Sequence, residues 1–527
     1  MTDTTDRPPY LVEGELDEAG APWWIRRAPA PLRGVHERDS YRWWVLVAVL
    51  SGLFATGLTI TVLTTAVPFI RSDFHASLAS VSWVVSAPFL FRSIFVPVFG
   101  KTGDRIGRRR TWLLGFAVSS LAAFLGGFAP NVAWLIVFRA VSAIGSAAVI
   151  PSALALIAVA FDADERVKAL GWWSATIAVS PLLGVITGGF VVESFGWRWI
   201  FFGQFPFSVV ALMLGFFVLR ESKGERDETF DVAGSVLSIV GLGALLLVFN
   251  RGVAGDWGWT SLPLLMTAVI AVTALVAFVR VELRSPAPVL PVGYFRRRRF
   301  AGAVSANFCA NFAYMGGFFI TSVMLADTAL FGYRADQVAL AVSPRAAALG
   351  IMGPIGGYMA ARYGGRRMAT IGMALIVASM VALAVVTDGA PYLLILPGLV
   401  LSGFGLGLVA PPAAATVTNE AAETDLSAAS GALNMGASIG SSMGIATMSA
   451  VLAGAAVSTE NPGAGAFAAA FLFGAALSAI GLFAAAQLGR DTGGATVDRD
   501  AAPPPLSAPP APGRSGPGSG GAGYLRR

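Results

Sequence analysis

Long apolar runs alternate with short polar segments along most of the chain. Spanning a hydrocarbon core of about 30 Å takes about 20 helical residues, because every backbone amide must find its hydrogen bond within the helix. Runs of this length begin near Trp43, Ser80, Thr111, Val132, Lys168, Trp197, Val232, Ser261, Phe300, Gln337, Met368, Pro391, Leu426 and Gly465. The pattern predicts an all-α polytopic membrane protein with fourteen transmembrane helices.

Two charged segments divide these runs into groups of six, two and six. One extends from Arg220 to Asp231 after the sixth run, and the other is the basic stretch from Arg296 to Arg299 after the eighth. We therefore expect two six-helix bundles with two inserted helices. The expected parts are a disordered cytoplasmic segment (1–42), an N-terminal bundle (43–220), a linker with helices seven and eight (221–298), a C-terminal bundle (299–489) and a disordered cytoplasmic tail rich in Pro, Gly, Ala and Ser (490–527).

Basic residues gather in alternate loops. One set of loops holds clusters such as Arg108 to Arg110 and the pair Arg366 and Arg367, whereas the other set holds single cations such as Arg198. Short cytoplasmic loops hold Lys and Arg, and exported loops largely lack them. Both termini are therefore predicted to be cytoplasmic, in a multi-pass protein of the plasma membrane.

The composition supports a membrane protein and weakens other classes. Hydrophobic residues make up 55% of the 527 residues and charged residues only 13%, which argues against soluble domains. The net charge of +6 lies in short clusters between apolar runs, so nucleic-acid binding is not expected. A single cysteine, Cys309, and two histidines outside the apolar runs, His36 and His75, offer no metal site, cofactor site or catalytic base. We expect no enzyme and no cofactor.

An internal repeat links the two predicted bundles. The segment GKTGDRIGRRR from Gly100 aligns with GYMAARYGGRR from Gly357, so that Gly107 matches Gly364 and Arg109 matches Arg366. Repeats of this kind are typical of transporters whose halves enclose a binding site near the membrane midplane. The alternative is that Gly and Arg simply recur at helix ends near the cytoplasm.

The same segment resembles a known family signature. It is similar to the loop between helices two and three of the major facilitator superfamily, and the stretches WRWIFFGQFP from Trp197 and DWGWT from Asp256 look like its fourteen-helix drug/proton antiporter group of the QacA/EmrB type. The resemblance implies two six-helix bundles plus two inserted helices. It also implies that the loop stabilises one access state, with the candidate gating residues Gly100, Asp104, Arg105, Gly107 and Arg108.

The chain departs from the family pattern at several helix positions. Thr59 stands where the family usually has an acid, and Thr64 stands where it has Asn. Ser142, Ser180 and Ala437 also replace family residues. These departures concern the positions at which the family couples transport to cations.

Three arginines inside apolar runs are candidates for substrate binding or coupling. A charge at the centre of a membrane helix costs about 2.5 to 3.5 kcal/mol on insertion scales, so Arg92, Arg139 and Arg345 should each face a cavity or a partner. For Arg92 and Arg345 the functional hypothesis is attraction of an anionic or carbonyl-rich ligand, and for Arg139 the resemblance implies gating or proton relay. The alternative for all three is a hydrogen bond to backbone carbonyls of another helix.

Proton coupling needs a titratable carrier, normally a buried carboxylate. The candidates are Asp104 and Asp327, each with a simpler alternative. Asp104 also balances the arginines around it, and Asp327 also reads as a solvated loop residue.

Small residues form two narrow helix faces that permit close helix approach. In helix five they are Pro181, Gly184 and Gly188, and in helix thirteen they are Gly436, Gly440 and Gly444. The resemblance implies that these helices flank the central cavity and act as hinges, and the alternative is static packing.

We therefore expect a secondary active transporter that exports small hydrophobic or amphipathic compounds, such as drugs or antibiotics, by alternating access and proton antiport. One alternative is an exporter of a lipid or anionic natural product with different or no proton coupling. Another is a non-transporting membrane receptor or scaffold. The expected partners are substrate, protons and the lipid bilayer, and the expected oligomeric state is a monomer.

Overall fold

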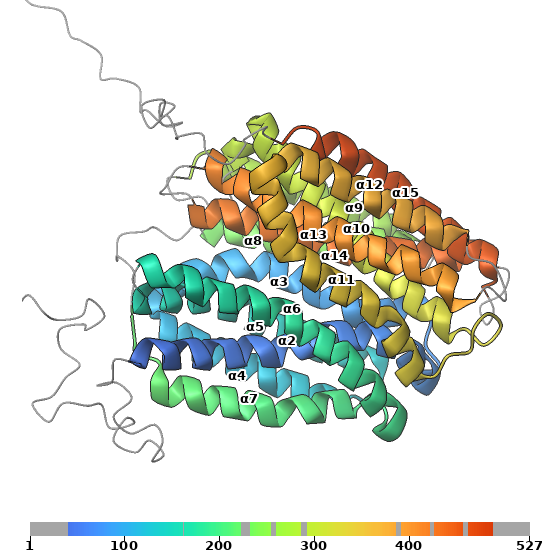
Figure 1. The fold of residues 1–527 in the computed structure, drawn as a ribbon, viewed down its shortest axis with the longest axis horizontal. Coiled ribbons are helices and arrows are strands. Elements are labelled where there is room, and N and C mark those ends of the chain that lie inside the picture. The colour runs from blue at the N-terminus through green and yellow to red at the C-terminus, as the bar shows by residue number, and fades with distance from the viewer. Residues whose placement is uncertain are drawn as a thin grey trace, which may run out of the picture. The chain divides into compact units, whose positions relative to one another are not determined.

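The computed structural model describes residues 40–161, 163–222, 232–253, 260–285, 292–385, 391–421, 426–456 and 462–488. Fourteen long α-helices occupy nearly all of this part of the chain, and their labels follow Figure 1. The predicted all-α fold with fourteen long helices is confirmed. Residues 1–39 and 489–527, which hold most of the predicted N-terminal segment and the whole predicted tail, lie outside the described residues.

The helices follow one another in the predicted order of six, two and six. The N-terminal group contains α2 (Tyr41–Phe74), α3 (Leu78–Ile106), α4 (Arg108–Gly126), α5 (Val132–Ala160), α6 (Ala163–Phe195) and α7 (Trp199–Val218). Next come α8 (Val232–Val253) and α9 (Leu262–Glu282), which pack against each other, while α8 also contacts α3 and α14. The short 3₁₀ helix η4 (Val292–Arg296) precedes the C-terminal group, which contains α10 (Arg298–Ala326), α11 (Ala335–Tyr363), α12 (Gly365–Ala384), α13 (Tyr392–Glu420), α14 (Leu426–Ala455) and α15 (Ala464–Ala485).

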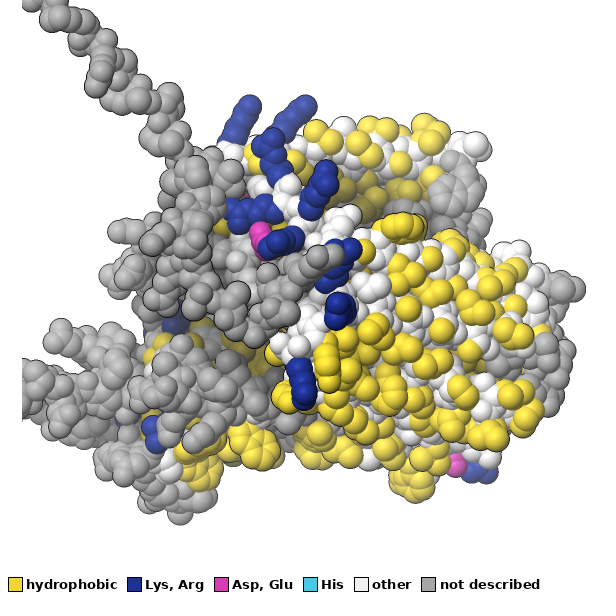
Figure 2. Space-filling view, turned by 45° about the horizontal axis from the view of Figure 1, so that its top comes forward, with side chains coloured by type: hydrophobic (Ala, Val, Ile, Leu, Met, Phe, Trp, Pro, Cys, Tyr) yellow, Lys and Arg dark blue, Asp and Glu magenta, His cyan; other side chains and the backbone are white. Residues whose placement is uncertain are grey.

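The surface of the described helices is largely apolar. Ten of the helices are both long and apolar enough to cross a bilayer, and α3, α6 and α8 contain shorter apolar stretches. Large side chains such as Leu114, Phe190 and Phe483 are 64% to 76% exposed, which water would disfavour but lipid accommodates. Figure 2 shows a broad hydrophobic surface bordered by Lys and Arg side chains. The protein therefore spans a membrane.

Glycine turns confirm the internal repeat. Gly107 joins α3 to α4 with φ 127° and ψ 133°, and Gly364 joins α11 to α12 with φ 95° and ψ 133°. Side chains rarely adopt such positive φ values, which explains glycine at both sites. The end of the helices that carries these two turns and their arginines is called the arginine-rich end below, and the other is the opposite end.

The buried core differs between the two ends. One large cluster contains residues of both groups, for example Leu63 of α2, Val185 of α6 and Val342 of α11. The N-terminal group contributes to it only residues near the opposite end, while its residues near the arginine-rich end, such as Trp112 and Ala153, form a separate cluster. The large core thus joins the two groups towards the opposite end, and a smaller cluster, in which Leu90 and Ile94 of α3 lie near Met435 and Ile439 of α14, joins them nearer the middle.

The predicted small faces pack helices within each group. A Cβ at Gly184 would overlap the carbonyl oxygen of Leu58, so α6 lies directly against the backbone of α2. In the same way Gly440 and Gly444 of α14 lie against the carbonyls of Phe308 and Phe312 in α10. Of the remaining predicted residues, Gly188 faces Val62, Gly436 faces Val304, and Pro181 lies inside α6 near Gly57. A hinge role for these residues stays a prediction.

Replacing Gly444 by Val should destabilise the protein by about 1–3 kcal/mol, because the added side chain would force α14 away from α10. The matched control is Gly454→Val in the same helix, where a Cβ would meet nothing within 4 Å. The measurement is the thermal unfolding midpoint of the purified protein in detergent. Equal midpoints for the two variants would contradict tight α10–α14 packing.

Candidate functional site

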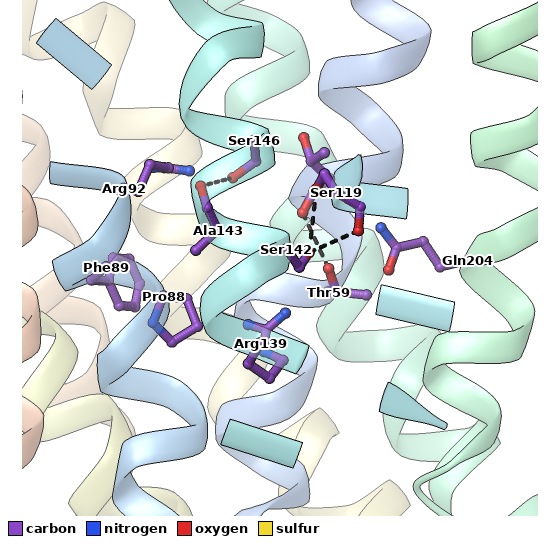
Figure 3. Close-up of a pocket in the computed structure, with 11 residues that line it drawn as sticks. Thr59, Pro88, Phe89, Arg92, Ser119, Arg139, Ser142, Ala143, Ser146 and Gln204 are labelled. Atoms are coloured by element: carbon purple, nitrogen blue, oxygen red, sulfur yellow. Dashed lines mark hydrogen bonds between the residues drawn. The ribbon is translucent and has the colours of Figure 1, made fainter. Parts of the chain in front are cut away.

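A polar cavity lies inside the N-terminal group, among α2, α3, α4, α5 and α7. Its volume is about 40 Å³, enough for about three water molecules or one small polar group. Figure 3 shows its lining side chains, with those of α5 running through the middle of the view. The lining residues are Thr56, Thr59, Pro88, Phe89, Arg92, Ser119, Arg139, Ser142, Ala143, Ser146 and Gln204.

Arg92 lies at the middle of α3, with fourteen residues before it and fourteen after it. Its side chain is partly buried, and it has no hydrogen bond or ion pair with another residue in the described part of the chain. In Figure 3 it extends from α3 towards α5, near Ser146. Arg92 therefore presents an unpaired guanidinium to the cavity.

Arg139 reaches the same cavity from α5 and is 6% exposed. Its Nε donates a hydrogen bond to the carbonyl oxygen of Val84 in α3 at 3.3 Å. That carbonyl lies four residues before Pro88, which has no N–H to bond it in the usual helical pattern. Pro88 thus frees the acceptor that anchors Arg139.

Hydroxyl and amide groups complete the lining. Ser142 of α5 donates to the carbonyl of Ser119 in α4 at 3.0 Å. Gln204 of α7 is 7% exposed, and its Oε1 has no hydrogen-bond partner among the described residues. Gln204 was not among the predicted site residues, although an amide within the apolar segment FFGQFPF was a signal that could have found it.

The cavity contains cations but no carboxylate. None of its lining residues is Asp or Glu. Every Asp and Glu within the fourteen helices lies among the first or last four residues of its helix. The positive charges of Arg92 and Arg139 therefore have no compensating acid at their depth in these helices.

Arg345 does not share this cavity. It is fully buried in α11, and its Nη2 donates to the carbonyl oxygens of Tyr314 at 2.6 Å and Ala313 at 3.4 Å in α10. Its guanidinium carbon also lies 4.5 Å from the centroid of the Tyr314 ring, within the range of a cation–π contact. The structure thus brings Arg92 and Arg139 together and holds Arg345 within the C-terminal group.

The turn at Gly107, which is predicted to act in gating, is held by a residue that the sequence did not single out. Glu221, just after α7, accepts hydrogen bonds from the backbone N–H groups of Arg109 at 3.0 Å and Arg110 at 3.3 Å. A carboxylate there satisfies free amides at the N-terminus of α4 and interacts favourably with the helix dipole. Gly107 leaves room for it, because a Cβ would overlap Glu221. No local sequence pattern joins two residues so far apart in the chain.

The other predicted gating and coupling residues lie at helix ends. Gly100 and Asp104 belong to the last turns of α3, and their side chains lie outside the described part. Arg105 is exposed, and the backbone N–H of Arg108 bonds to Ser222. Asp327 follows α10 and accepts a hydrogen bond from the N–H of Ala329 at 2.9 Å, so it orders the loop between α10 and α11.

An ion pair joins the two groups at the opposite end. Glu193 of α6 lies 3.1 Å from Nε of Arg334, just before α11, and accepts a hydrogen bond from the backbone N–H of Ala335 at 3.2 Å. The hydrogen bond from Arg334 to Asp336, with the charges of Asp336 and Glu193, raises the pKa of Arg334 above its usual value. A carboxylate of one group thus caps a helix of the other.

The sequence profile of the Major Facilitator Superfamily matches residues 49–296 and 306–516. The chain belongs to this superfamily. It is 30% identical to Multidrug resistance protein Stp of Mycobacterium tuberculosis over 418 residues, which cover 79% of this chain and 77% of Stp. It is 31% identical to the Tetracenomycin C resistance and export protein of Streptomyces glaucescens over 432 residues, which cover 81% and 78%. The predicted family is confirmed, and these relatives indicate a transporter rather than an enzyme.

Solved structures of other transporters share the fold. The peptide transporter POT in complex with sulfate aligns with a TM-score of 0.63 at 14% identity, covering 88% of this chain and 98% of POT. A bacterial homolog of the human lysosomal transporter Spinster aligns with a TM-score of 0.56 at 17% identity, covering 85% and 96%. At such identities the likeness shows the fold alone.

Replacing Glu221 by Ala should lower the stability of this superfamily member by about 1–2 kcal/mol, because the N-terminus of α4 loses its capping carboxylate. Glu221→Gln keeps the volume and one acceptor, so its loss should be smaller. Thermal unfolding of both purified variants measures the effect. A destabilisation by Glu221→Gln equal to that by Glu221→Ala would show that the charge of Glu221 accounts for the whole effect, whereas an unchanged midpoint for Glu221→Ala would contradict capping of α4 by this residue.

Proposed function

We propose that this protein is a secondary active exporter of small hydrophobic or amphipathic compounds, which works by alternating access. The observation that carries the proposal is the family match across both six-helix groups, together with relatives named for drug resistance and export. A third relative, the Methylenomycin A resistance protein of Streptomyces coelicolor, is 29% identical over 408 residues, which cover 77% of this chain and 85% of that protein. Export of toxic compounds is the activity that these names share.

The arrangement of the two groups supports alternating access. They share a hydrophobic core and the Glu193–Arg334 pair towards the opposite end, while the N-terminal group has its own core near the arginine-rich end. A transporter needs such contacts to break at one end when they form at the other. The arginine-rich end is the cytoplasmic side in this proposal, so the structure corresponds to an inward-facing state. Both termini are then cytoplasmic, and the protein acts as a monomer in the plasma membrane.

Proton antiport remains part of the proposal, with Asp104 or Asp327 as carrier. Both acids lie at ends of helices that connect to loops, where water supplies and accepts protons. Protonation of such a residue would remove a negative charge at a helix end and so change the relative free energies of the two access states.

Expression of the wild type in an efflux-deficient host should raise resistance to some members of a panel of toxic compounds. A protonophore should restore accumulation of the exported compound, because it collapses the proton gradient. If Asp104 is the proton carrier, Asp104→Asn should abolish resistance. If Asp327 is the carrier, Asp327→Asn should abolish resistance and Asp104→Asn should not. Surface expression is compared for all variants.

The exchange of labelled for unlabelled compound separates coupling from folding, since exchange needs no net proton movement. A proton-carrier variant should retain exchange while losing accumulation against a gradient. Wild-type protein that is present at the surface but changes neither resistance nor accumulation of any compound would overturn the proposed export.

Glu193→Gln should shift the protein towards the state open at the opposite end, because it removes the charge that joins the two groups. Exposed ion pairs contribute about 0.2–1 kcal/mol, so the shift in population should be no more than about fivefold. Labelling of a cysteine introduced at Ala339, which packs against Gly189, measures it in a Cys309→Ala background. Asp336→Asn is the matched control because it leaves Glu193 in place, and equal labelling of both variants would exclude this role of Glu193.

A further inference from the structure

The cavity in the N-terminal group combines positive charge with unused hydrogen-bonding groups. Arg92 has no partner among the described residues, and Oε1 of Gln204 has none either. We propose that this cavity binds the acidic group of an amphipathic organic anion, which the transporter exports. The inference rests on the proposed function, because it names the chemical class of that exporter's substrate.

Arginine can be held in this protein without a ligand, and Arg345 shows how. Its Nη2 donates to two backbone carbonyls and its guanidinium lies over an aromatic ring, although its Nε and Nη1 have no hydrogen-bond partner among the described residues. Arg92 makes none of these contacts within the described residues, although it lies at the centre of its helix. A purely structural arginine at such depth would be expected to find comparable acceptors. The difference between these two residues favours a ligand-binding role for Arg92.

The lining selects the charge of the ligand. A guanidinium binds carboxylate, sulfonate or phenolate oxygens through charge-assisted hydrogen bonds. Arg92 offers its guanidinium N–H groups, while Arg139 keeps its Nη groups because only Nε bonds Val84. No lining carboxylate competes for these donors or attracts a cationic compound. An organic anion is therefore favoured over a quaternary ammonium ion.

The volume limits which part of the ligand enters. About 40 Å³ accommodates an acidic group but not an aromatic ring system. The hydrophobic body must then lie outside the cavity, where the side chain of Phe89 borders both the lining and the core shared by the two helix groups. The cavity acts as a subsite for the polar head, and the apolar body contributes hydrophobic affinity elsewhere.

The test compares ligands that differ in charge but little in shape. Full-length protein in detergent is titrated with 2-naphthoate and naphthalene-2-sulfonate, with 2-naphthamide as the neutral match and trimethyl(2-naphthylmethyl)ammonium as the cation. Equilibrium dialysis with labelled compounds gives each Kd. The two anions should bind at least about tenfold more tightly than the amide, as expected for hydrogen bonds between charged groups.

Two pairs of variants locate the binding. Arg92→Gln should lower the affinity for the anions by about tenfold or more and leave the affinity for the amide unchanged. Arg92→Lys should retain part of the affinity for the anions. Thr59→Asp places a carboxylate in the lining and should also weaken the anions, whereas Thr59→Asn is its uncharged control. The thermal midpoint of ligand-free Arg92→Gln should equal or exceed that of the wild type, because an unpaired charge is removed from the membrane interior.

Three outcomes would overturn the inference. The first is that neither anion binds saturably to the folded protein. The second is that the anions and the amide bind with equal affinity. The third is that Arg92→Gln weakens the binding of anions and amide equally and also lowers the thermal midpoint. Export measured in the resistance assay is independent of these probes. Resistance conferred by a protein that fails to bind either anion would overturn the anionic substrate class and leave the proposed exporter intact.

Discussion

Hydrocarbon offers no hydrogen-bond partner to a peptide group, and the rest of this structure depends on that constraint. It requires the backbone to be helical wherever the chain crosses the membrane, and it leaves helix association to close packing and a few polar contacts. Glycine supplies the close packing, as where Gly444 meets the Phe312 carbonyl and Gly184 meets that of Leu58. A charged side chain inside the bundle is then stabilised by a protein partner or by a ligand.

That requirement explains why the positions of the charged side chains indicate function. Carboxylates occupy only the ends of the helices, whereas arginines occur within them. Arg345 is anchored through its Nη2 to carbonyls of α10 and lies over aromatic rings, whereas Arg92 and Arg139 face a cavity without an acid. Export of an organic anion from such a site would also be favoured by a membrane potential that is negative inside, by about 2.3 kcal/mol per charge for 100 mV. The charge of the substrate would then contribute to the driving force for export. The interior of the bundle formed by the described helices has no carboxylate that could carry a proton in exchange.

Carboxylates at helix termini hold the contacts at the two ends of the bundle. Glu221 caps α4 within the N-terminal group, and Glu193 caps α11 across the two groups. Both use the same physics, in which a carboxylate satisfies amides that the first turn of a helix leaves free. The first contact stabilises the turn at Gly107, and the second joins the groups at the opposite end. Carboxylates thus fix the turn at Gly107 and the contact between the two groups through the same kind of bond.

The sequence by itself determined the helix count, the family and the repeat, because apolar run length and glycine at a positive-φ turn depend only on local chemistry. It also identified Arg92 and Arg139 as charges inside membrane helices, since any arginine in an apolar run is conspicuous. Only the tertiary structure decided that these two share a cavity while Arg345 bonds to α10, and that Glu221 and Glu193 each cap another helix. Such contacts join residues distant along the chain, and their geometry is set by how the helices pack rather than by any local pattern.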